Sequence, residues 1–379
     1  MLFCLYPKSI HGMLIWALVR SYLNSASLKS ETTRGRGHSL LNAAFRSAIH
    51  GLPRAAITRI AGRSLVAPCY HMVSDDSPIH TRHLYAERGI AEFEKDLDYL
   101  LQSFTPLSLE EIGSLSARGL SIPGNSLFLS FDDGFREMSE IVAPLCRRKG
   151  VPATFFLTTA FLDNRVLGSR HKASLLIDDC ERQGIGADSP ALKKLIQEAG
   201  LGPFESIRQT FLAVSHAQTH LLDECAVSLG VDFEDYLRTS RPYLTLDQVR
   251  GLIQEGFSIG GHSIDHPRYG DLEFNEQIRQ TVECIQYLTG NFPVPCKAFA
   301  FPFVSDGVDD RFFEEVLTKN IADLVFCIGR MPTKSHKRAF QRFGVESPRP
   351  QQIEDLLTQQ AEGALRKQLF SWKSKEACN

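Results

Sequence analysis

The sequence predicts an α/β fold, a distorted (β/α) barrel that carries a helical insertion. Short apolar runs of strand length alternate with segments whose apolar residues recur every three or four positions. One strand–helix–strand passage, residues 126–158, fits within about 30 residues, the size of a unit with two parallel strands. The alternation then stops between about 164 and 243, where the apolar spacing is helical and no strand-like run occurs. Repeated β–α units on both sides of this segment favour a barrel or a related α/β fold.

The first half of the predicted barrel extends from residue 65 to residue 158. A short strand is expected at 65–71 and an amphipathic helix at 90–101. Ser108-Leu109-Glu110-Glu111 is a capping box that opens the next helix. The apolar run 126–131 is a strand, a helix follows and ends at Gly150, and 153–158 is a buried strand.

The second half resumes after the predicted insertion. Thr245-Leu246-Asp247-Gln248 is a second capping box, and its helix ends near Gly256. The remaining expected elements are a strand at 257–262, a helix near 276–287 that Gly290 ends, a strand at 298–301, a helix at 311–317 and a strand at 324–328.

Length and composition limit the domain organisation and the class of protein. The chain has 379 residues, 43% hydrophobic and 23% charged, which excludes a largely disordered or collagen-like protein. The net charge of −2 gives no basic footprint for nucleic acid. We expect an N-terminal extension at 1–63, a barrel domain at 64–348 with its insertion at about 164–243, and a helical tail at 349–379.

Cysteine usage and the N-terminus bear on the compartment. The nine cysteines include no C-x-x-C pair, which predicts free thiols in a reducing, cytoplasmic compartment and leaves any metal site to His and carboxylates. The apolar stretch 13–19 is far shorter than the ~20 residues that span a bilayer, and no clear cleavage site follows it. We therefore expect no transmembrane span; peripheral membrane contact through 1–63 is the alternative to a flexible leader.

Three motifs lie where predicted strands end, the rim at which barrels gather catalytic groups. Asp132-Asp133-Gly134 places two carboxylates side by side, which repel unless a cation or proton relieves them; an ordinary turn or helix cap is the alternative. His262 and His266 can reach one metal ion, and Pro267 favours a loop there. Phe301-Pro302-Phe303 is either wall packing or a backbone N–H beside a pocket.

Together these motifs closely resemble the polysaccharide deacetylases, the NodB-homology group or carbohydrate esterase family 4. The resemblance covers about residues 65–345 and includes the opening Tyr70-His71. It implies a distorted (β/α) barrel that hydrolyses the N-acetyl group of an amino sugar with a divalent metal ion. Zinc is the first expectation for this cofactor, and cobalt, nickel and iron are the alternatives.

The resemblance also implies roles for individual residues. Asp133, His262 and His266 would be the metal ligands, Asp132 the general base, and Phe303 the donor of a backbone N–H to the oxyanion. His71, which ends the first predicted strand and can approach the rim, and Pro302 are candidates to contact the substrate; for His71 a structural role with satisfied hydrogen bonds is the alternative.

The sequence departs from the family pattern at three points. Val304 stands where many members have Gly, and the Arg that often precedes the third motif is replaced by Lys297-Ala298-Phe299-Ala300. Arg342 is a candidate to supply that cation. The late Leu-x-His that usually gives the general acid is missing, and His336, the only His after His266, lies in a polar segment typical of a solvated loop.

These observations favour a metal-dependent deacetylase of an N-acetylated saccharide or its lipid-linked or nucleotide-linked precursor. A non-catalytic carbohydrate-binding protein on the same fold is the alternative that the departures raise. A metal-dependent hydrolase of a non-sugar amide is a third hypothesis, in which the insertion at 164–243 covers the pocket and selects small ligands.

Overall fold

The computed structural model describes Ile57, Ile60 and residues 65–363, except 187, 202–205, 334–335 and 347–350. The chain divides into two units, one of residues 65–351 and one that combines 1–64 with 352–379. The predicted extension at 1–63 therefore lies almost entirely outside the described residues. In the predicted tail the structure describes a helix over 353–363. Among the described helices, none is both long and apolar enough to cross a bilayer.

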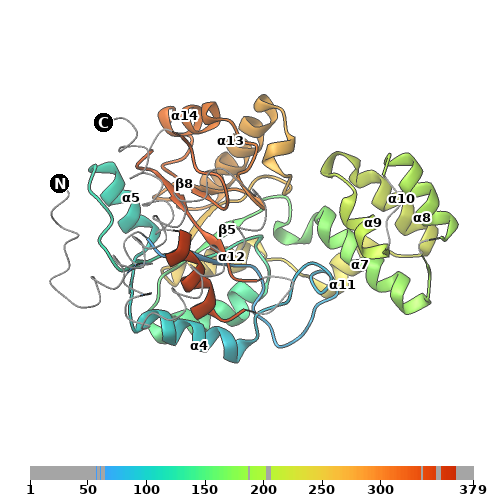
Figure 1. The fold of residues 1–379 in the computed structure, drawn as a ribbon, viewed down its shortest axis with the longest axis horizontal. Coiled ribbons are helices and arrows are strands. Elements are labelled where there is room, and N and C mark those ends of the chain that lie inside the picture. Colours follow the sequence, from blue (N-terminus) through green and yellow to red (C-terminus); the bar gives the residue numbers. More distant parts are fainter. Residues whose placement is uncertain are drawn as a thin grey trace, which may run out of the picture. The chain divides into compact units, whose positions relative to one another are not determined.

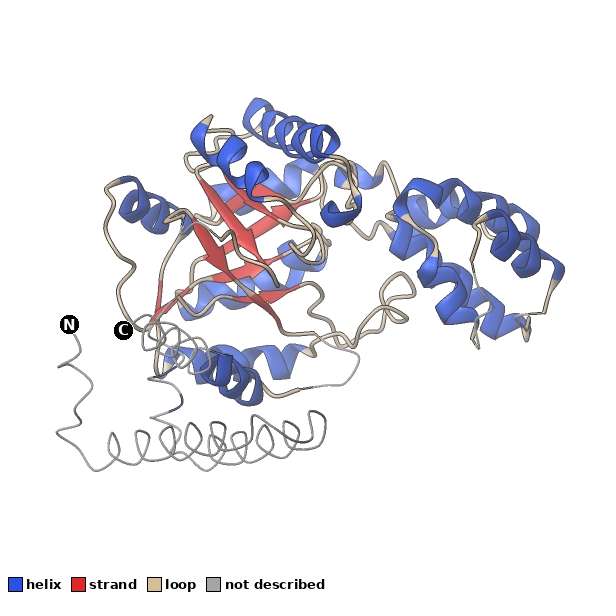
Figure 2. Ribbon diagram, turned by 45° about the horizontal axis from the view of Figure 1, so that its top comes forward, coloured by secondary structure: helices blue, strands red, loops and turns tan. Residues whose placement is uncertain are grey.

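An eight-stranded sheet forms the centre of the larger unit, and all its neighbouring strands are parallel (Figure 2). The strand order is β10-β1-β4-β5-β6-β7-β8-β9. The strands are β1 (Pro68–Tyr70), β4 (Leu129–Phe131), β5 (Ala153–Leu157), β6 (Ser258–Gly261), β7 (Ala298–Ala300), β8 (Leu324–Cys327), β9 (Ala339–Gln341) and β10 (Phe343–Gly344). This architecture confirms the predicted (β/α) barrel.

One segment of chain joins the two edges of this sheet. β9 pairs with β8 and β10 pairs with β1, yet only Arg342 separates β9 from β10. Arg342 N donates to Cys327 O on one side, and the next residue, Phe343, donates to Ala67 O on the other. Residues 339–344 therefore bring the sheet to a nearly closed barrel, and the sequence analysis assigned no strand there.

Helices follow most strands, as the alternating pattern predicts (Figure 1). They are α4 (Ile90–Leu101), α5 (Leu109–Ala117), a π-helical turn η2 (Met138–Val142), α6 (Ala143–Lys149), α12 (Leu246–Gln254), α13 (Phe274–Asn291) and α14 (Asp310–Thr318). Both predicted capping boxes are present, with reciprocal hydrogen bonds between Ser108 and Glu111 and between Thr245 and Gln248.

The strand predicted at 126–131 divides in two. β3 (Ser126–Leu127) pairs with β2 (Thr105–Pro106) in a separate two-stranded sheet, and only β4 joins the barrel. The division falls at Phe128, whose N–H donates to Val66 O and not to either neighbouring strand.

The segment between β5 and α12 is helical, as predicted. It contains α7 (Ser169–Gln183), α8 (Pro190–Glu198), α9 (Ile207–Ala213), α10 (Thr219–Leu229) and α11 (Phe233–Ser240). α7 to α10 form a small bundle (Figure 1) with an apolar core of their own, which includes Leu176, Leu192, Phe211 and Leu222. Because it buries its own core, this bundle has no need of the barrel interior for packing.

Aromatic rings fill the barrel interior beneath the rim. Phe128 stacks on Phe326 with ring centroids 4.6 Å apart, and Phe156 lies 5.4 Å from Phe326. Gly260 of β6 faces this layer, because a Cβ added there would lie 2.5 Å from the Phe156 ring. Its neighbour Gly261 faces the other way, where an added Cβ would meet Cys284 Sγ at 2.9 Å. The Gly-Gly pair thus lets β6 fit closely on both faces.

This packing predicts that Gly260→Ala lowers the free energy of unfolding by about 1–3 kcal/mol, the usual cost of overpacking a filled core. Chemical denaturation of the purified variant measures the effect. Gly251→Ala is the matched control, because nothing lies within 4 Å of an added Cβ on this helical residue. The control should be neutral or stabilising by up to about 1 kcal/mol. Equal stability of Gly260→Ala and wild type would contradict the packing.

Candidate active site

The motif residues meet at the carboxyl ends of the strands. Asp132 and Asp133 follow β4, His262 follows β6, and Phe303 comes shortly after β7. Parallel neighbouring strands end at the same rim, so these side chains come together although 166 residues of chain separate the first motif from the last. His71, which follows β1 directly, lies at the same rim.

Asp133, His262 and His266 form a compact group of potential metal ligands. One ligand atom from each lies within 4.8 Å of the others. Asp133 Oδ1 is 3.1 Å from His266 Nε2 and 3.5 Å from His262 Nε2. Ligands that share one zinc ion at about 2.1 Å from it stand at such separations. Asp133 Oδ1 and His262 Nε2 are buried and have no hydrogen-bond partner, as expected of atoms aimed at a cation.

The protonation of this group also suits a metal. His262 Nδ1 lies 2.9 Å from Ala300 O and so carries the proton, which leaves the lone pair on Nε2. Burial lowers the pKa of His262 to about 4, so the ring is neutral near pH 7. Burial alone would raise the pKa of Asp133, but His266, His71 and His262 hold it well below its usual range. A carboxylate and two imidazoles of this kind fit a divalent ion such as zinc.

Several site residues have left-handed backbone conformations. The φ angles are +76° at Asp133, +71° at Ser263, +66° at His266 and +57° at Phe303. For a residue other than glycine, this backbone conformation destabilises the folded state by about 1 kcal/mol or more, and such residues cluster at functional sites. The two histidines lie in a loop, as Pro267 predicted, and Ser263 Oγ accepts the His266 N–H at 2.9 Å to hold it. The backbone is therefore bent to aim these side chains inward.

Asp132, the residue before the ligand Asp133, forms a bidentate ion pair with Arg342 inside the barrel. Arg342 Nη1 and Nη2 donate to Oδ1 and Oδ2 at 2.7 and 2.8 Å, and the two side chains are 0% and 2% exposed. The guanidinium carbon also lies 4.9 Å from the centre of the Phe156 ring, on top of the aromatic layer. Burial would raise the pKa of Asp132, but Arg342 and His262 bring it to about 2. Arg342 thus fixes Asp132 in place and keeps it ionised.

A second pair, His71 and Glu346, stands beside Asp132. Glu346 Oε2 lies 3.1 Å from His71 Nδ1, while Oε1 accepts the backbone N–H groups of His71 and Met72 at 2.6 and 3.1 Å. The Glu346 side chain is 1% exposed and that of His71 24%. Burial would lower the pKa of His71, but the Glu346 carboxylate raises it to about 9. His71 is therefore a protonated imidazole at the rim near pH 7.

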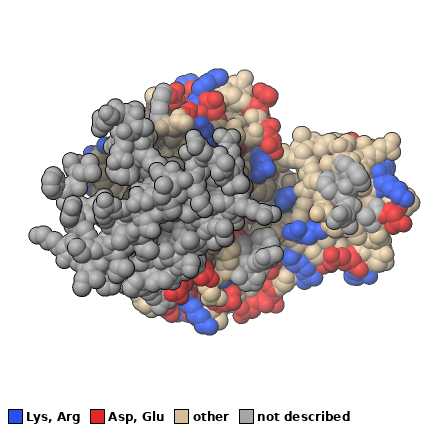
Figure 3. All heavy atoms as spheres, viewed as in Figure 1, with Lys and Arg blue, Asp and Glu red and all other residues tan. Residues whose placement is uncertain are grey.

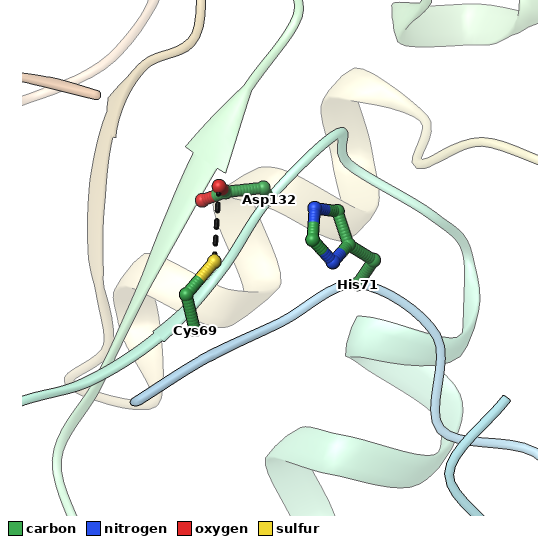
Figure 4. A group of neighbouring side chains, drawn as sticks. All are labelled: Cys69, His71 and Asp132. Atoms are coloured by element: carbon green, nitrogen blue, oxygen red, sulfur yellow. Dashed lines mark hydrogen bonds between the residues drawn. The ribbon is translucent and has the colours of Figure 1, made fainter. Parts of the chain in front are cut away.

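Cys69 completes the surroundings of Asp132 (Figure 4). Its buried thiol donates to Asp132 Oδ2 at 3.1 Å, and the His71 ring lies close to both residues. Cys69, His71 and Asp132 are also close enough to hold a metal ion. Arg342 already occupies both carboxylate oxygens, however, and burial raises the pKa of Cys69 well above its usual value. This group therefore lacks the thiolate that a metal requires of a cysteine ligand.

The other predicted residues have distinct surroundings. The Phe303 ring packs edge-on against His266 with centroids 4.6 Å apart, and its side chain is 37% exposed. Pro302 beside it is buried. His336 lies before β9, at the amino end of that strand and hence away from the rim. It cannot reach the site as a general acid.

Sequence reasoning named Arg342 only as a weak candidate and missed Glu346 and Cys69 as partners. A signal for Glu346 exists, because residues 342, 344 and 346 share one face of an extended chain. The charged Arg342 and Glu346 on that face, between the apolar Phe343 and Val345, mark a strand with a polar inner side. Cys69 gives no comparable signal, since a lone cysteine in an apolar strand is usually structural.

A comparison with known proteins identifies the family of this chain. Residues 121–317, 197 of 379 and hence just over half of the chain, match the family model described as polysaccharide deacetylase. The chain belongs to this family. Membership supports a hydrolase of amide bonds with an acetylated saccharide as its substrate class.

Solved structures with similar folds include two from bacteria. One is the Streptococcus pyogenes deacetylase PplD in complex with acetate, with 15% identity over 78% of this chain and 97% of that chain and a TM-score of 0.48. Another is IcaB from Ammonifex degensii, with 16% identity over 79% and 98% of the respective chains and a TM-score of 0.47. No curated protein matches the sequence.

The buried ion pair predicts a large effect of Arg342→Met. Without its partner, ionised Asp132 is left buried, so the free energy of unfolding should fall by about 3–5 kcal/mol. Adding Asp132→Asn should restore more than half of this loss, because the uncompensated charge is gone. Urea denaturation at pH 7 measures all three proteins.

Arg238→Met is the matched control, since Arg238 pairs with Asp235 at the surface. It should cost less than about 1 kcal/mol. If Arg342→Met costs no more than this control, Arg342 does not hold Asp132 as described.

Proposed function

We propose that this protein is a metal-dependent deacetylase that hydrolyses the N-acetyl group of an amino sugar in a saccharide or its precursor. The observation that carries the proposal is the convergence of Asp133, His262 and His266, two of them with unpartnered buried ligand atoms, directly beside the ionised Asp132. These three residues would hold the ion. A divalent cation bound there polarises the acetamide carbonyl and lowers the pKa of the attacking water.

Asp132 is placed to take the proton of that water. Its Oδ2 lies 3.8 Å from His262 Nε2, so the carboxylate borders the ligand group without joining it. Arg342 and Cys69 hold its two oxygens from the side opposite the rim. A carboxylate with a pKa of about 2 is a weak base, so it accepts a proton only from a water already made acidic. Because of this low pKa, Asp132 is ionised at every physiological pH.

Phe303 is placed to stabilise the oxyanion. Its left-handed backbone turns the chain just after β7, next to the ligand His266. Among the described residues, no acceptor takes its backbone N–H. A free N–H at this point could donate to the oxygen of the acetyl group as negative charge develops on it.

His71 is placed to donate the proton that the leaving amine needs. Water adds its oxygen to the acetyl carbon and passes a proton to Asp132. The carbon–nitrogen bond then breaks as the sugar nitrogen takes a proton from His71, so acetate and the free amine are the products. Glu346 keeps His71 protonated at neutral pH. The pair would thus perform the task of the missing Leu-x-His.

The alternative of a non-catalytic binding protein rests on the missing Leu-x-His and the changed third motif, where Val304 replaces Gly. The proposed enzyme is supported against it by Arg342 and His71, which supply a cation and an acid from other strands. A cytoplasmic location stays a prediction. The seven cysteines that the structure describes are all free and buried, which supports it.

The metal site predicts that Asp133→Ala and His262→Ala each lose both the metal and acetate release. Elemental analysis of the purified wild type should give about one divalent ion per chain. Acetate release from N-acetylated chito-oligosaccharides should fall about a thousandfold or more in either variant, because the ion contributes several kcal/mol to the transition state. His220→Ala, on the exposed side of α10, is the control that keeps both. Full activity in a metal-free variant would refute the proposal.

The His71–Glu346 pair predicts the alkaline limit of activity. In wild type the rate should fall as the pH rises through about 9, where His71 loses its proton. In Glu346→Gln the negative charge that raises this pKa is absent, so the fall should move by at least one pH unit toward 6.5, the ordinary value. Rates of acetate release between pH 5 and 10 measure the alkaline limit of the wild type and of the Glu346→Gln variant. An unchanged alkaline limit would exclude His71 as the acid.

A further inference from the structure

Three arginines from separate elements gather beside the metal ligands. Arg170 lies in the first turn of α7, and Arg268 follows His266 by two residues. Arg208 lies in α9, one turn before Leu212, whose carbonyl oxygen accepts a hydrogen bond from Arg170. The Arg170 guanidinium carbon is 5.8 Å from the centre of the Phe303 ring, and that ring is 4.6 Å from the His266 ring. Arg170 is therefore separated from the proposed metal site by one aromatic side chain.

Neutral carbonyl groups, not carboxylates, accept hydrogen bonds from Arg170 and Arg208. Arg170 Nη1 donates to Leu212 O at 2.7 Å, and Arg208 Nε donates to His83 O at 2.9 Å. Among the residues that the structure describes, no acidic side chain forms an ion pair with any of the three. Charged neighbours do find partners, since Lys172 of the same helix pairs with Asp223 at 2.6 Å. No carboxylate of the described residues therefore neutralises the charge of these arginines.

The charges of Arg208 and Arg268 act on Arg170. Burial, Arg208 and Arg268 all lower the pKa of Arg170. The first turn of α7 contains no acidic residue that would oppose this effect. Elsewhere the described surface on the face drawn in Figure 3 mixes basic and acidic side chains. An unpaired group of arginines next to a catalytic site is therefore a local feature, and an anion would relieve its repulsion.

We propose that Arg170, Arg208 and Arg268 bind a phosphoryl group of the substrate, so that the enzyme deacetylates a phosphate-linked or diphosphate-linked N-acetyl sugar in preference to a neutral polymer. This inference rests on the proposed deacetylase function. A phosphoryl group fits because it offers several oxygens to guanidinium groups that approach from different sides. The helical insertion, which carries Arg170 and Arg208, then selects the substrate.

The test compares matched substrates on the metal-loaded enzyme. Acetate release is measured with methyl N-acetylglucosaminide and chitotetraose as neutral substrates. The anionic substrates are N-acetylglucosamine 1-phosphate, uridine diphosphate N-acetylglucosamine and a farnesyl diphosphate-linked N-acetylglucosamine in detergent, which separate the free, nucleotide and lipid sources of the phosphate. Wild type should have a higher kcat/KM for at least one anionic substrate than for either neutral one.

Arg170→Gln and Arg268→Gln should each lower kcat/KM for that anionic substrate about tenfold or more, because a hydrogen bond to a charged group is lost. The neutral substrates should change less than threefold. Arg118→Gln, on the exposed end of α5, is the control without effect. Equal loss on neutral and anionic substrates, or faster reaction of the neutral ones in wild type, would overturn the proposal.

A second readout separates this proposal from the deacetylase function. Calorimetric titration with inorganic pyrophosphate, at equal metal content, should show at least about tenfold weaker binding by Arg170→Gln/Arg268→Gln than by wild type. If no substrate releases acetate but this difference is found, the deacetylase function fails and the phosphoryl site stands. If pyrophosphate binds both proteins equally, the phosphoryl site is refuted whatever the activity.

Discussion

The bidentate pair between Arg342 and Asp132 is the interaction on which the rest of the site depends. Its two side chains are almost completely buried, so neither can be removed without leaving a charge in a medium that solvates it poorly. Arg342 stands between β9 and β10, the two short strands that bring the sheet together at its edges. The segment that closes the barrel therefore also orients the Asp132 carboxylate. The aromatic layer at Phe156 supports the guanidinium from below.

The same segment also controls the protonation of the rim. Glu346 follows Arg342 by four residues. It accepts the backbone N–H of His71, and its second carboxylate oxygen lies 3.1 Å from His71 Nδ1, which raises the pKa of His71 to about 9. Arg342 meanwhile keeps Asp132 ionised with a pKa of about 2. One stretch of chain thus keeps an ionised carboxylate and a protonated imidazole close to the proposed ligands. General acid–base catalysis requires these opposite protonation states at one pH.

Much of the fold follows from local signals in the sequence, and part of the site does not. Capping boxes, apolar runs and the ending of helices at glycines locate most elements of the barrel, because each depends on a few neighbouring residues. Asp133, His262 and His266 carry their own motif and do lie together. The strand at 339–344 is too short and too polar to be recognised by an apolar run. The roles of Arg342 and Glu346 depend on partners more than 200 residues away, Asp132 and His71, and no periodicity reports such contacts.

The protonation state of His71 is the most direct test of this account. Nuclear magnetic resonance of protein labelled with ¹⁵N in histidine gives the pKa of each ring, and His71→Gln assigns its signal. With the metal removed by a chelator, His71 should keep both ring protons well above pH 7 and titrate near pH 9, while His262 stays neutral down to about pH 4. A His71 that titrates at or below its ordinary value of 6.5 would contradict the claim that Glu346 prepares it as the acid.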